Sequence, residues 1–97
     1  MKAIDAKEIT NTAKKELRKE LEKTFNDLMA HVYANIRKCA TDGDSFFTFE
    51  WNKCGVVKDV KDHKKSFMLY DMLAEKLYNE GFKISSADGM VFVRWQD

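Results

Sequence analysis

The N-terminal part of the sequence carries one continuous apolar stripe, which limits the possible folds more than any other feature. Its members are three or four residues apart, the period of an α-helix. The stripe consists of Ile9, Ala13, Leu17, Leu21, Phe25, Leu28, Val32, Ile36 and Cys39. A helix from Asp5 to Thr41 would be on the order of 54 Å long at about 1.5 Å per residue, nearly twice the diameter of a small domain. The sequence therefore predicts one long helix that either breaks or reaches past its own core.

Both ends of this predicted helix carry recognisable signals. Asp5 as the N-cap with Glu8 three residues later is a capping box, and Ile4 with Ile9 is the accompanying hydrophobic staple. Gly43 predicts the stop, because glycine readily adopts the left-handed conformation that follows a last helical turn.

A strand and a second helix are expected next. Residues 45–51 (SFFTFEW) are rich in aromatic side chains and alternate between two faces, which is typical of a strand. Residues 63–80 have apolar side chains at helical spacing and are followed by Gly81, a helix stop. The intervening residues 52–62 suit a short helix and a bulged loop equally well.

The last part of the chain predicts a β-hairpin. Residues 82–86 and 90–95 flank Asp88 and Gly89, a dipeptide suited to tight turns. With the strand at 45–51 they would form a three-stranded antiparallel sheet, with the helices packed on one face. The side chains expected on that inner face are Phe47, Phe49, Trp51, Phe82, Ile84, Val91, Val93 and Trp95. The predicted fold class is α+β, in the order long N-terminal helix, strand, helix and β-hairpin.

Length and composition indicate a single domain. The 97 residues suffice for one domain, 1–97. The 17 Lys and Arg residues balance 16 Asp and Glu residues, so the total charge does not favour a nucleic-acid or membrane partner. We expect no export signal and no membrane span, because no apolar run approaches about 20 residues. Two cysteines are too few for a secreted disulfide framework, so we expect a cytoplasmic protein.

No group of residues in the sequence indicates a reaction. His31, Cys39, Cys54 and His63 have metal-ligand chemistry but lack the paired short spacing of a zinc module. Thiol catalysis needs a base and an orienting group, and neither cysteine has them nearby in sequence. The isolated glycines form no phosphate-binding loop. We expect no catalytic, metal or cofactor site, and an enzyme would require His31 or His63 to meet a cysteine in the fold.

The charged flanks of the apolar stripe favour a protruding, self-pairing helical arm at residues 5–24. Pairing with a second copy would bury Ile9, Ala13, Leu17 and Leu21. The alternative is a break between Thr24 and Asp27 that folds the arm back.

The outer face of the predicted sheet is a second candidate contact surface. Its large apolar side chains are Phe46, Met90 and Phe92, which could contact a protein partner. Alternatively, Phe46 and Phe92 beside Lys83 and Arg94 could form a stacking platform for single-stranded nucleic acid.

DNA binding is the alternative function. If residues 55–62 formed a short helix, the element order would be that of a winged helix, with residues 64–80 as recognition helix and 85–90 as wing tip. The basic side chains that could contact DNA are Lys58, Lys61, Lys64, Lys65 and Lys76. The acidic side chains that would oppose phosphates are Asp71, Glu75, Glu80 and Asp88.

Two segments, IRKCATDGDSFFTFEW and LAEKLYNEGFKISSADGMVFVRW, resemble a pattern found in small uncharacterised proteins of tailed bacteriophages. The resemblance covers roughly the last sixty residues. The residues that carry it are Ala40, Gly43, Trp51, Leu73, Gly81, Phe82 and Trp95. It implies an intracellular accessory or virion-associated protein and supplies no catalytic residue. We therefore expect a non-enzymatic homodimer that also binds an unidentified host or viral protein.

Overall fold

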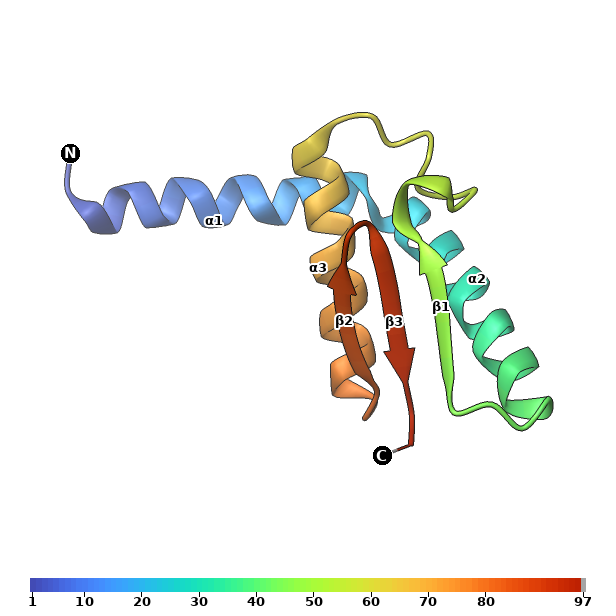
Figure 1. Ribbon diagram of the computed structural model, residues 1–97. Helices are drawn as coiled ribbons and strands as arrows, with labels where there is room; N and C mark the ends of the chain where they lie inside the picture. The colour runs from blue at the N-terminus through green and yellow to red at the C-terminus, as the bar shows by residue number, and fades with distance from the viewer. Residues whose placement is uncertain (97) are drawn as a thin grey trace.

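The computed structural model describes residues 1–96, and these form an α+β fold of helices and one three-stranded antiparallel sheet (Figure 1). The elements are α1 (Ala3–Glu20), α2 (Glu22–Thr41), β1 (Phe46–Glu50), the 3-10 helix η1 (Trp51–Lys53), α3 (His63–Asn79), β2 (Lys83–Ala87) and β3 (Met90–Arg94). The predicted class and element order are confirmed. No helix within residues 1–96 is long and apolar enough to cross a membrane.

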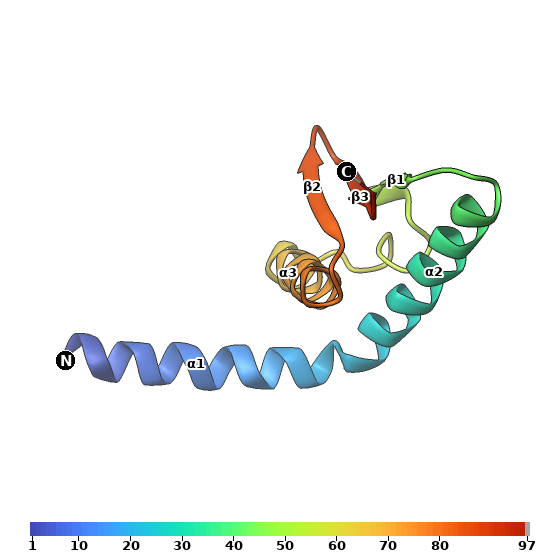
Figure 2. The ribbon, with the colours of Figure 1, turned by 90° about the horizontal axis from the view of Figure 1, so that it is seen from below.

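The predicted long helix bends at Leu21, which separates α1 from α2. Leu21 has φ −89° and ψ −2°, and its side chain is 4% exposed. No residue of α1 is buried, whereas α2 buries Leu28, Met29 and Val32. The bend therefore lies where the apolar stripe first enters the core. The predicted break between Thr24 and Asp27 with a folded-back arm is wrong, because α1 projects away from the rest of the molecule (Figure 2).

The start of the first helix also differs from the prediction. The N-cap is Lys2, and Asp5 is the third helical residue. The Asp5 carboxylate accepts a hydrogen bond from the Lys2 backbone N–H at 3.2 Å. The Asp5 side chain therefore caps the N-terminus of α1 from within the first turn. An acidic side chain at this position also interacts favourably with the helix dipole.

The core lies between the sheet and the helices α2 and α3, which cover the same face (Figures 1 and 2). The strand order is β1-β3-β2, which places the hairpin strand β3 in the centre. The buried side chains of the core are Leu28, Met29, Val32, Cys54, Val57, Leu69, Leu73, Leu77, Val91 and Val93. Six of the predicted inner-face residues belong to this core or pack against it, namely Phe49, Trp51, Phe82, Ile84, Val91 and Val93. Phe47 and Trp95 are only half-buried and lie outside this group.

The segment between η1 and α3 is a series of hydrogen-bonded turns, which settles the alternatives left open for residues 52–62. Val57 N–H donates to the Cys54 carbonyl at 3.0 Å, and Val60 N–H donates to the Val57 carbonyl at 2.8 Å. The side chains of Cys54 and Val57 anchor these turns, because both are buried in the core.

The predicted helix stop at Gly81 is confirmed. Gly81 has φ +93°, and its N–H donates to the Tyr78 carbonyl at 3.1 Å. Phe82 N–H donates to the Leu77 carbonyl at 2.9 Å, which completes a Schellman motif. The motif reverses the chain from α3 directly into β2.

The start of α3 provides a test of this local structure. The Asp62 side chain accepts hydrogen bonds from the Lys64 and Lys65 N–H groups at 2.9 and 3.4 Å. Asp62→Ala should lower the free energy of unfolding by about 1 kcal/mol, because these helical donors lose their acceptor. Asp59→Ala, in the preceding turns, removes the same charge without removing a cap. Chemical denaturation should separate the two variants, and equal stabilities would contradict the assigned cap.

Candidate functional site

The first exposed feature of the molecule is the arm formed by α1. Only its last turn is tied to α3 by ion pairs: Arg18 Nη2 lies 3.4 Å from Glu75 Oε2, and Lys65 Nζ lies 3.4 Å from Glu20 Oε2. Such solvent-exposed pairs contribute little to stability. The rest of the arm extends past the body (Figure 2).

The arm is a weak helix by itself. A helix in a protein gains most of its stability from tertiary packing of an apolar face, and none of the 18 residues of α1 is buried. Thr10, Asn11 and Thr12 lie in its centre and have modest helix propensity. The Thr12 hydroxyl donates to the Glu8 carbonyl at 3.0 Å, an arrangement that does not strengthen a helix. The arm therefore gains most if another surface packs against it.

The four predicted arm contacts have different environments. Ile9 is 60% exposed and Ala13 is exposed, so both are open to a partner. Leu17 is half-buried at the junction with the body. The prediction that Leu21 belongs to a self-pairing surface is wrong. The helix bends at Leu21, and this side chain is already buried within the single chain.

The outer face of the sheet carries the other predicted contacts. Phe46 is 51% exposed, and Met90 and Phe92 are half-buried. Phe92 is directly opposite Thr48 on β1 and Ser85 on β2, so these three side chains share a face. The helices pack on the other side of the sheet, and α1 does not cover the outer face (Figure 2).

The predicted basic contacts do not form one patch. Lys58 and Lys61 lie in the turns before α3, Lys64 lies in its first turn and Lys76 in its last. Lys65 is half-buried and paired with Glu20. About 18 Å of helix separates Lys64 from Lys76 at about 1.5 Å per residue.

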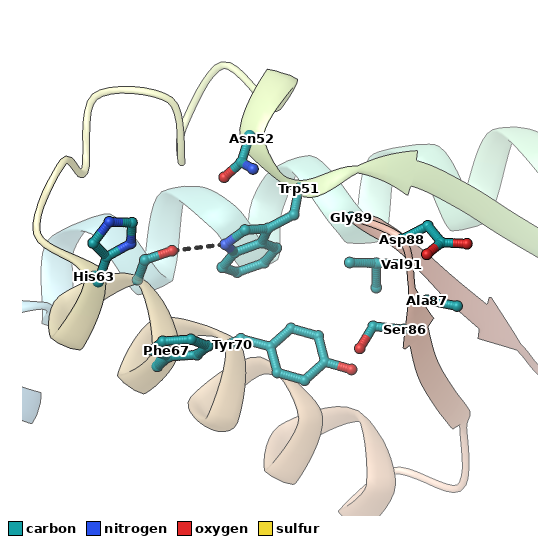
Figure 3. Close-up of a pocket in the computed structure, with 11 residues that line it drawn as sticks. Trp51, Asn52, His63, Phe67, Tyr70, Ser86, Ala87, Asp88, Gly89 and Val91 are labelled. Atoms are coloured by element: carbon teal, nitrogen blue, oxygen red, sulfur yellow. Dashed lines mark hydrogen bonds between the residues drawn. The ribbon is translucent and has the colours of Figure 1, made fainter.

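A pocket lies between α3, the β2–β3 turn and the end of β1 (Figure 3). None of the predicted contact residues lines it. Its volume is about 390 Å³. The Trp51 indole N–H donates to Ser66 Oγ at 2.8 Å across it. The Trp51 ring meets the Tyr70 ring edge-on, with centroids 5.5 Å apart and planes at 84°. Trp51 was predicted from the sequence to be a core residue, and this pocket was not predicted. The one sequence feature that could have pointed to it is the pair of aromatic residues one helical turn apart, Phe67 and Tyr70.

One polar contact joins the middle of α2 to the C-terminal end of α3. The Tyr33 hydroxyl on α2 is hydrogen-bonded to Glu80, the C-cap of α3. Desolvation by burial, together with the hydrogen bond to Glu80 and the negative charge of Glu80, raises the pKa of Tyr33 to about 12. This contact links the two core helices.

The residues with metal-ligand chemistry are dispersed. Cys54 is buried and Cys39 half-buried, and both are free thiols. Within the described part of the chain, no three His, Cys, Asp or Glu side chains are grouped so as to hold a metal ion. His63 lies at the pocket described above.

No family model, curated protein or solved structure matches this chain. The assignment of a role therefore depends on the surfaces themselves.

The Tyr33–Glu80 contact makes a prediction about alkaline stability. Because the folded-state pKa of Tyr33 lies above the unfolded value of about 10, its contribution is present below about pH 10 and is lost as the pH rises through about 12. In Glu80→Gln the Tyr33 titration should move down towards 10, as read from phenolate absorbance. Tyr33→Phe removes this phenol, so the absorbance change that is lost in this variant belongs to Tyr33. A Tyr33 titration unchanged by Glu80→Gln would contradict this account.

Proposed function

We propose that the protein is a non-enzymatic interaction protein that works as a homodimer formed through α1. The observation that carries the proposal is a helix in which no residue is buried but which displays Ile9 and Ala13 on the continuation of a core-facing stripe. A second copy of the same stripe is the simplest surface that would cover it.

The apolar contact available on the arm is small. Ile9 and Ala13 contribute one large and one small side chain, and Leu17 adds part of another. Association has to overcome lost translational and rotational freedom, so an interface of this kind should be weak. We therefore expect a dimer that dissociates on dilution rather than an obligate one.

The outer face of the sheet is proposed as the surface for a different protein. Phe46, Met90 and Phe92 give it an apolar centre, and α1 does not cover it within one chain (Figure 2). The resemblance to small tailed-phage proteins supports an accessory role in which that partner is a host or viral protein. Such a role requires complementary shape and needs no reactive group.

A second candidate, DNA binding, is favoured by one observation. The order α2, β1, turns, α3 and hairpin, together with the strand order β1-β3-β2, is the topology of a winged helix in which turns replace the middle helix. The electrostatics support it less, because Asp71 and Glu75 lie on the exposed side of α3. Homodimerisation through the arm is compatible with either role.

Light scattering coupled to size exclusion over a concentration series tests the arm. The wild type should approach twice the 11.3 kDa chain mass at high concentration. Ile9→Glu should shift the protein to monomer, because a carboxylate would be buried at the interface. Asn11→Glu adds the same charge away from the stripe and should leave the dimer intact. A wild-type monomer at every concentration, or equal effects of both variants, would overturn the pairing.

Binding to duplex DNA tests the second candidate. If α3 and the preceding turns contact phosphates, the affinity should fall steeply with salt, and Lys64→Gln should lower the slope of log K against log salt by about 1. Lys7→Gln, on the exposed arm, is the matched control. Absence of salt-sensitive binding at micromolar protein would remove this candidate.

A further inference from the structure

The pocket between α3 and the β2–β3 turn presents aromatic surfaces on adjacent walls. The Trp51 and Tyr70 rings are nearly perpendicular, so their faces meet at a corner. Phe67 lies one turn before Tyr70 on the same helix and is 72% exposed at the pocket (Figure 3). An exposed phenylalanine beside two other rings is unusual for a surface that binds only water.

The Trp51 wall is held in place from both directions. Its indole N–H donates to Ser66 Oγ at 2.8 Å, and its backbone N–H donates to the Gly89 carbonyl at 2.9 Å. The second bond attaches the hairpin turn to the end of β1. With its N–H already bonded, the indole offers a ligand its π-face rather than a hydrogen-bond donor.

The charged groups around the pocket favour a cation. Asp88 on the hairpin turn brings a negative charge to the rim, although its carboxylate is directed away from the Trp51 and Tyr70 rings (Figure 3), and the lining contains no lysine or arginine. The Tyr70 and Ser86 hydroxyls make no hydrogen bond within residues 1–96, so they remain open to a ligand. The negative ring faces would repel an anion, and the nearby charge of Asp88 adds to that repulsion.

We propose that this pocket binds the trimethylammonium group of a small organic cation. Such a group is attracted by aromatic faces, and the negative charge of Asp88 adds a longer-range attraction. The volume of about 390 Å³ is within the range of small-molecule sites. The site is distinct from the arm and from the apolar centre of the outer sheet face, since neither α1 nor Phe46, Met90 or Phe92 lines it.

Choline is the probe, and its uncharged carbon isostere is the matched ligand control. Titration should move the Trp51 indole N–H signal in a nitrogen-correlated NMR spectrum, while the Trp95 signal stays in place. The isostere has nearly the same shape, so it should bind clearly more weakly if the charge is recognised. Equal binding of both compounds, or no shift at high millimolar choline, would overturn the proposal.

Three variants locate the binding on the protein. Phe67→Ala should weaken choline binding about two- to fivefold, as expected for one exposed cation–π contact. Tyr78→Ala removes another exposed ring of α3 that does not line the pocket, so it should have no effect. Asp88→Asn keeps a residue suited to the tight turn, removes the charge and should also weaken binding. Unchanged affinity in both Phe67→Ala and Asp88→Asn would place choline elsewhere and contradict the site.

Discussion

The apolar core that α3 shares with the sheet is the feature on which the rest of the structure depends. Leu69, Leu73 and Leu77 recur every four residues along one side of α3, and each is 0% exposed. They belong to the same core as Val91 and Val93 of β3, which alternate with outward-facing residues as a strand requires. Full burial of side chains of this size is worth roughly 1.5–3 kcal/mol each, far more than any of the surface ion pairs.

The candidate pocket is a consequence of how this core is closed. The Schellman turn at Gly81 sends the chain from the end of α3 back along the sheet, so the β2–β3 turn returns to the level of the helix start. There Asp88 and Gly89 adopt positive φ values of 53° and 79°, as a tight hairpin requires. The hairpin tip is bonded to Trp51 on the neighbouring strand, and the space left between that tryptophan and α3 is the pocket.

Local sequence signals predicted most of this fold. The features that were not predicted depend on contacts between residues far apart in the sequence. The alternation of residues 45–51, the helix stop at Gly81 and the Asp88-Gly89 turn act over a few residues, and each is present in the structure. The pocket could not be foreseen, because Trp51 and Tyr70 are joined only by the packing of a strand end on a helix. Phe47 and Trp95 were placed in the core by alternation alone, which identifies a face of a sheet but not how far the helices cover it.

Periodicity has the same limit in the first helix, and there it bears on function. The stripe from Ile9 to Cys39 has one period throughout, yet it lies on solvent before Leu17 and in the core after Leu21. Helical spacing of apolar residues identifies a face that can be covered. It does not show whether the covering surface belongs to the same chain. Beyond the bend, α1 extends away from α3 and the sheet, so the body does not cover this part of the stripe (Figure 2). The exposed part of the stripe would be stabilised if another surface covered it, and the proposed pairing of two arms would supply that surface.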